Sequence, residues 1–141
     1  MSYIGSSLLQ KLYFMKEYML LIRNTSDSKA SFTAEKHKEF VTACEIYIGK
    51  LIKGGNLIAA QPLIREGHII SGKPATWKNT PLDMSKDIQV GYYHILAKDM
   101  NEAIEIAKGN PEFEYTPGAS AEIRPIKMKE EVTGFVYPKE D

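Results

Sequence analysis

The stretch IQVGYYHILA, residues 88–97, has the strongest strand character in the chain and decides the fold. It is rich in β-branched and aromatic side chains, the residue types that are enriched in β-strands. Apolar or aromatic residues occupy both alternating sets of positions between Val90 and Leu96, and also between Tyr18 and Ile22. Because successive side chains of a strand point to opposite faces, both faces of these two strands are expected to be covered. Residues 88–97 are therefore predicted to form a central strand.

Two amphipathic helices are predicted, one before this strand and one after it. The first spans residues 33–53, where apolar residues recur at spacings of three or four, a threonine can cap the first free amides, and a glycine pair ends the pattern. The second spans residues 100–108. Asp99 is its predicted N-cap, and Glu102 three residues later completes a capping-box pattern.

The other segments predict short strands. KEYMLLIRN at residues 16–24 is the first strand, residues 56–64 and 68–71 are expected to form a hairpin, and residues 121–127 are the last strand. Residues 72–87 are expected to form a long irregular loop, which is either a functional lid or a surface insertion. The element order is βαβββαβ, or βαββαβ if the hairpin is discounted. This order predicts an α+β domain of the ferredoxin-like type.

Two helices on one face of such a sheet leave its other face without a cover. We expect the same face of a second subunit to cover it in a twofold homodimer. The alternative is that an N-terminal extension, residues 1–14, and a C-terminal tail, residues 129–141, fold back over that face. The extension precedes a second methionine, Met15, so it is either a helical segment that packs on the domain or an upstream start. Residues 15–128 are expected to form the single domain.

The composition limits the classes of partner. The 141 residues include 18 lysines and arginines and 18 aspartates and glutamates, so the formal net charge is 0. This balance provides no basic surface for nucleic acid or for an anionic membrane, and neither is expected as a partner. A single cysteine cannot form an internal disulfide, which favours the cytoplasm. No segment has the pattern of a membrane span or of a targeting signal.

Several segments between Lys16 and Ile126 are similar to the YCII-related family, and in particular to its DGPF branch. They are KEYMLLI in the first strand, Gln61-Pro62-Leu63, NTPLDMSKDIQVGYYHI at residues 79–95, DMNEAIEIAKGNPEF at residues 99–113, and AEIRPI at residues 121–126. The resemblance implies a dimeric α+β barrel, in which two ferredoxin-like sheets face one another. The apolar residues on both faces of the strands indicate the same architecture independently.

The chain departs from that branch at its signature. Where the branch has Asp-Gly-Pro-Phe, this chain has Asn79-Thr80-Pro81-Leu82, so the signature carboxylate is absent. The resemblance also implies a histidine early in the first helix that pairs with an aspartate, and His37 stands at the histidine position. The positions nearest to the aspartate hold Lys53 and Asn110, and neither is a carboxylate that could orient an imidazole.

His37 is nevertheless the candidate catalytic residue, as a general base or hydrogen-bond donor in a cleft between the first helix and the sheet. The candidate ligand-binding residues are Trp77 and Asn79 from a lid formed by residues 73–87, and Tyr93 and His94 from the central strand. For each of them a structural role is the alternative. The three histidines lack the spacing of metal ligands, so no metal site is expected, and no cofactor motif is present.

These residues leave three functions open, of which the third is a purely structural interaction protein. The first is a cofactor-independent enzyme that acts on a small organic molecule by acid–base chemistry at the helix–sheet cleft. The second is a non-catalytic module that binds a small ligand or has a regulatory role, which the missing carboxylates favour. The sequence does not decide whether the chain is an enzyme.

Overall fold

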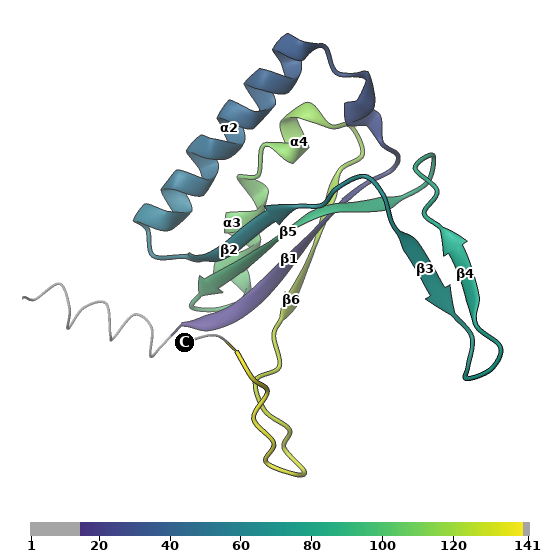
Figure 1. The fold of residues 1–141 in the computed structure, drawn as a ribbon. Coiled ribbons are helices and arrows are strands. Elements are labelled where there is room, and N and C mark those ends of the chain that lie inside the picture. Colours follow the sequence, from purple (N-terminus) through teal and green to yellow (C-terminus); the bar gives the residue numbers. More distant parts are fainter. Residues whose placement is uncertain (1–14, 140–141) are drawn as a thin grey trace, which may run out of the picture.

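A four-stranded antiparallel sheet forms the centre of the protein in the computed structural model, which describes residues 15–139 (Figure 1). The strands are β1 (Lys16–Asn24), β2 (Leu57–Pro62), β5 (Ile88–Ala97) and β6 (Ser120–Pro125), in the order β2-β5-β1-β6. β5 is an interior strand, because it pairs with β1 on one side and with β2 on the other. The predicted α+β class and the central position of β5 are confirmed.

Two helices, α2 (Ala34–Lys53) and α3 (Met100–Lys108), cover one face of this sheet. They share one core cluster with alternate strand residues; its members are Tyr18, Leu20, Ile22, Tyr47, Leu51, Tyr93, Ile95, Ala97, Ala103 and Ala107. Strand residues that are two positions apart point to the same face, so both helices pack on the same face of the sheet. The other face carries no helix within residues 15–139.

Side-chain caps begin both helices, as predicted. Thr33 Oγ1 accepts a hydrogen bond from the backbone N–H of Lys36 at 3.1 Å, and Asp99 Oδ1 accepts one from the backbone N–H of Glu102 at 2.8 Å. Each bond satisfies one of the free amides in the first turn of a helix. After α2 the chain turns at Gly55, whose φ of 73° is readily adopted by glycine. Local sequence signals therefore fix the ends of both helices.

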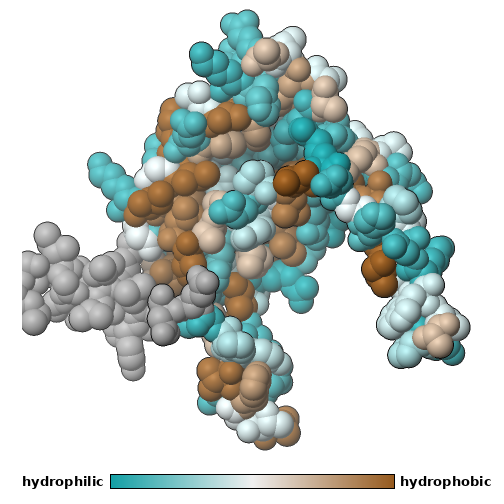
Figure 2. Space-filling view, viewed as in Figure 1, coloured by the Kyte–Doolittle hydropathy of each residue, from teal (hydrophilic) through white to brown (hydrophobic). Residues whose placement is uncertain are grey.

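The prediction that residues 56–64 and 68–71 pair as a hairpin is wrong. β3 (His68–Ser71) instead pairs with β4 (Lys78–Pro81) in a separate two-stranded sheet, and β4 lies within the segment predicted to be an irregular loop. The sequence KNTP conceals β4, because asparagine and proline are depleted in strands. This hairpin, which we call the β3–β4 arm, projects from the body in Figure 1 and forms a separate lobe with hydrophobic atoms on its surface in Figure 2.

Two short helical turns, η1 (Ser28–Ser31) and α4 (Glu112–Tyr115), complete the described elements. After β6 the chain forms a C-terminal hairpin closed by a bridge between Lys129 and Val136. None of the helices within residues 15–139 combines the length and hydrophobicity that a bilayer-spanning segment needs. The predicted N-terminal extension, residues 1–14, lies outside the described residues.

Replacing Leu20 by alanine tests the assigned core. Leu20 is 0% exposed on β1, so Leu20→Ala removes apolar contacts and leaves a cavity. We expect the free energy of unfolding, measured by urea denaturation, to fall by about 2–5 kcal/mol. Val132→Ala is the control: Val132 is 96% exposed, and its replacement should change stability by less than about 0.5 kcal/mol. Equal effects of the two substitutions would contradict the core described above.

Candidate functional site

A cleft of about 430 Å³ lies between α2 and the edge of the sheet formed by β2. Its walls come from α2, from β2 and the segment that follows it, and from β5. Leu82 and Met84, which lie between β4 and β5, also line it. Ligand pockets in proteins have volumes of about 300–1,000 Å³, so this cleft has the size for a small organic molecule.

The wall of the cleft is mainly apolar. α2 contributes Phe40, Val41, Cys44 and Ile48. The sheet and the segment after β2 contribute Ile22, Ala60, Leu63, Ile64, Ile88 and Val90. The α2 residues lie at spacings of one, three and four, so one stripe of the helix faces the cleft. Ile64 is 83% exposed and therefore lies at the mouth of the cleft.

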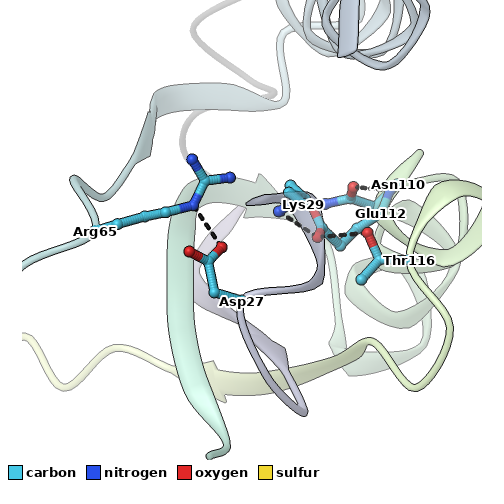
Figure 3. Close-up of polar contacts among 6 residues, drawn as sticks. All are labelled: Asp27, Lys29, Arg65, Asn110, Glu112 and Thr116. Atoms are coloured by element: carbon cyan, nitrogen blue, oxygen red, sulfur yellow. Dashed lines mark hydrogen bonds and ion pairs between the residues drawn. The ribbon is translucent and has the colours of Figure 1, made fainter. Parts of the chain in front are cut away.

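A buried ion pair between Lys29 and Glu112 lines the cleft, and Figure 3 shows its two side chains. Lys29 Nζ lies 2.5 Å from Glu112 Oε1, and the two side chains are only 10% and 7% exposed. The same carboxylate oxygen accepts a hydrogen bond from Thr116 Oγ1 at 3.1 Å. Lys29 Nζ also lies 5.1 Å from the centroid of the Phe40 ring, which is a cation–π contact. Because each buried charge needs its partner, this pair should be a fixed feature of the wall.

Asn110 also lines the cleft and is 4% exposed. Its Oδ1 accepts a hydrogen bond from the backbone N–H of Glu112 at 2.8 Å, and this bond fixes which side-chain atom is the oxygen. Its Nδ2 has no hydrogen-bond partner among the described residues. A buried donor without an acceptor costs about 1–3 kcal/mol. Because the Nδ2 atom itself is buried, it lies inside the wall of the cleft and not on the surface that a ligand would contact.

Arg65 brings a second cation to the cleft. Its Nε donates to Asp27 Oδ1 at 2.5 Å, while its side chain remains 45% exposed. Its two terminal nitrogens form no hydrogen bond with the described residues. Asp27 directly precedes η1 and Lys29 lies within it, so Arg65 contacts the residue before the turn that carries Lys29 (Figure 3). The polar end of the cleft, as we call it below, consists of Arg65, Lys29, Asn110 and Glu112.

Two of the predicted site residues, His37 and Tyr93, line the cleft. His37 is exposed, and its ring forms no hydrogen bond within residues 15–139. Tyr93 is 9% exposed, and its ring packs edge-on against Tyr47 with the centroids 5.5 Å apart. Burial raises the pKa of Tyr93 above its ordinary value, so its hydroxyl stays protonated at neutral pH. His37 thus lies at the rim of the cleft, and Tyr93 belongs to its floor.

The other predicted residues lie elsewhere. Trp77 and Asn79 belong to the β3–β4 arm and do not line the cleft. Trp77 is 63% exposed, and Asn79 Oδ1 lies 2.8 Å from His68 Nδ1 on the neighbouring strand. The structure does not bring these residues together with His37. Of the predicted lid, only Leu82 and Met84 line the cleft.

His94 lies on the face of the sheet opposite to the helices, because it alternates with the core residues Tyr93 and Ile95. Its Nε2 lies 2.7 Å from Glu17 Oε1, and Lys139 Nζ donates to Glu17 Oε2 at 2.7 Å. Burial alone would raise the pKa of Glu17, but hydrogen bonds from Lys139 and His94 outweigh it and lower that pKa. This histidine–carboxylate pair is separate from the cleft.

Sequence reasoning missed three residues of the polar end. Lys29 lies in a polar stretch before α2, Arg65 in a turn, and Glu112 in the connection after α3. Lys29 and Arg65 belong to no periodic pattern or motif, and Glu112 lies in the segment 99–113 that resembles the family, where nothing indicated a role in a cleft. The Asn110-Pro111 pair after α3 was recognised as part of the family resemblance, without any indication that Asn110 would face a cleft.

The cysteine in the cleft wall is not a reactive nucleophile. Burial raises the pKa of the Cys44 thiol to about 11, and the negative charge of Glu112 acts in the same direction. The thiolate is the reactive form of cysteine, so this side chain is unreactive at neutral pH. Within residues 15–139, no three histidine, cysteine or acidic side chains are grouped so that they could hold a metal ion.

No family model and no curated protein matches this chain. The functional argument therefore starts from the contacts of the cleft and of its polar end.

Breaking the buried ion pair should destabilise the protein. Lys29→Met leaves the Glu112 carboxylate buried without its cation, and we expect a loss of about 3–5 kcal/mol in unfolding free energy. Chemical denaturation at neutral pH measures this loss. The control is Lys108→Met, which removes an ion pair with Glu105 whose side chains are 67% and 70% exposed and should cost less than about 1 kcal/mol. A similar small loss for Lys29→Met would mean that the pair is not buried in solution.

Proposed function

We propose that this protein binds a small, mainly apolar organic molecule in the cleft between α2 and β2. The observation that carries the proposal is the cleft itself, which has a volume of about 430 Å³ and largely apolar walls. Burial of apolar ligand surface against these walls would drive binding, and the few polar groups at one end would orient the ligand.

Binding without catalysis fits the side chains better than acid–base chemistry does. A general base is normally held in place by a partner, whereas the ring of His37 has none among the described residues. The protonated thiol of Cys44 offers no nucleophile. An enzyme that uses His37 as its base is the second candidate, and it is favoured by one observation, the position of His37 on the cleft wall.

A neutral fluorescent probe, N-phenyl-1-naphthylamine, tests the binding site. It should bind with increased emission, because the cleft excludes water from an apolar ring system. Val41→Trp places a larger side chain in the cleft and should weaken binding about fivefold or more. Ile46→Trp is the matched control, since Ile46 is 57% exposed on α2 and does not line the cleft. No binding by the unaltered chain, or equal binding by both variants, would exclude the cleft as the site.

We further propose that the chain is a YCII-related protein whose ferredoxin-like sheet forms a dimeric α+β barrel with a second copy. The antiparallel strand order β2-β5-β1-β6 supports a split βαβ arrangement. The helix-free face carries Met19, Leu21, Tyr92 and Leu96, all half-buried, and a second sheet would cover them. The arm and the C-terminal hairpin extend beyond the sheet on the side away from α2 (Figure 1), and both show hydrophobic atoms in Figure 2.

The mass of the particle in solution tests the dimer. Light scattering during gel filtration should give about twice the chain mass of 15.9 kDa at micromolar concentration. Leu21→Lys places a charge on the helix-free face and should shift the particle toward monomer. Ile46→Lys introduces the same charge on an exposed surface of α2 and should leave the dimer intact. A monomer mass for the unaltered chain would overturn the proposed dimer.

A further inference from the structure

We propose that the ligand of the cleft carries a carboxylate, which Arg65 and Lys29 recognise at the polar end. This inference rests on the proposed binding function, and it specifies the class of ligand: a monocarboxylate with an apolar body. It follows from the balance of hydrogen-bond donors, acceptors and charges around the cleft.

Arg65 provides the geometry for a carboxylate. Its Nε is occupied by Asp27, which orients the guanidinium and leaves the two terminal nitrogens for another partner. Those nitrogens carry four N–H groups in one plane, which match the two oxygens of a carboxylate. Asp27 does not line the cleft, so its carboxylate does not occupy the space of the ligand.

Lys29 adds further donors, and its charge is already paired with that of Glu112. The Lys29 ammonium has three donors, and its contact with Glu112 engages one side of it. The Asn110 amide adds no donor for the ligand, because its Nδ2 is buried and its Oδ1 accepts a hydrogen bond from the backbone N–H of Glu112. The negative charge of Glu112 is neutralised by Lys29, so it would repel an incoming anion only weakly. The polar end therefore offers more donors than acceptors.

The acidic residues of the wall do not favour a cationic ligand. Besides Glu112, the cleft is lined by one other carboxylate, Glu45, which is exposed on α2 and therefore screened by solvent. Both cations are ion-paired, Arg65 with Asp27 and Lys29 with Glu112, so the preference for an anion rests on the terminal N–H groups of Arg65, which a cationic group could not use. The apolar walls exclude a ligand that is polar throughout, because its polar groups would lose their hydrogen bonds to water.

A pair of ligands that differ only in the acidic group tests the inference. 2-Naphthoate and 2-naphthamide share the apolar body, and calorimetric titration at neutral pH gives both affinities. We expect the carboxylate to bind about tenfold more tightly, because hydrogen bonds to a charged group are the stronger ones. Arg65→Gln should weaken 2-naphthoate about tenfold and change 2-naphthamide by less than about twofold.

Arg124→Gln is the matched control, because Arg124 lies on β6, its side chain is 69% exposed and it does not line the cleft. It should change neither affinity. Binding of N-phenyl-1-naphthylamine by Arg65→Gln verifies that the variant keeps an intact cleft. Equal affinities of the two naphthalene compounds, or an equal loss of both in Arg65→Gln, would overturn the carboxylate while leaving the binding function in place. Failure of all three compounds to bind the unaltered chain would overturn both proposals.

Discussion

β1 and β5 pair antiparallel from Lys16↔Ala97 to Asn24↔Ile88, and this pairing determines which side chains of the sheet face the helices. Leu20 and Ile95, both 0% exposed, lie on that face, and the C-terminal half of α2 packs against it through Tyr47 and Leu51. Toward its N-terminal end α2 rises away from the sheet (Figure 1). The α2 residues that line the cleft run from His37 to Ile48, so the cleft extends from this diverging end past the middle of the helix.

The parts of the fold that depend on local interactions could be predicted from the sequence. Thr33 and Asp99 cap their helices through backbone amides three residues away, which is a contact that sequence spacing specifies. The pairing of β3 with β4 could not be predicted in this way. The four residues of β4, KNTP, have little strand preference, and the partner strand β3 lies across a turn. In that hairpin the cross-strand contacts prevail over the preference of the single residues.

The same distinction applies to the site. His37 could be placed near a helix–sheet cleft because it belongs to the apolar stripe of a periodic helix. Tyr93 was predicted together with His94, and the sequence did not show which of the two faces the helices, because both faces of that strand are apolar. Lys29, Arg65 and Glu112 come from three irregular segments, and only the folded chain brings them together. A charged residue in a turn has no periodicity that would reveal its neighbours. The sequence thus predicted the apolar wall of the cleft, and it did not predict which charged residues lie at its polar end.

The β3–β4 arm determines what intrinsic fluorescence can report about this protein. Trp77 is the sole tryptophan among the 141 residues, and it lies 63% exposed on a hairpin whose strands pair only with each other. Its emission therefore follows the surroundings of the arm, whereas far-ultraviolet circular dichroism is dominated by α2 and the central sheet. A hairpin with few contacts to a body can open at a lower free energy than the body itself. Denaturation curves from the two signals can then differ even when the body unfolds in a single cooperative step.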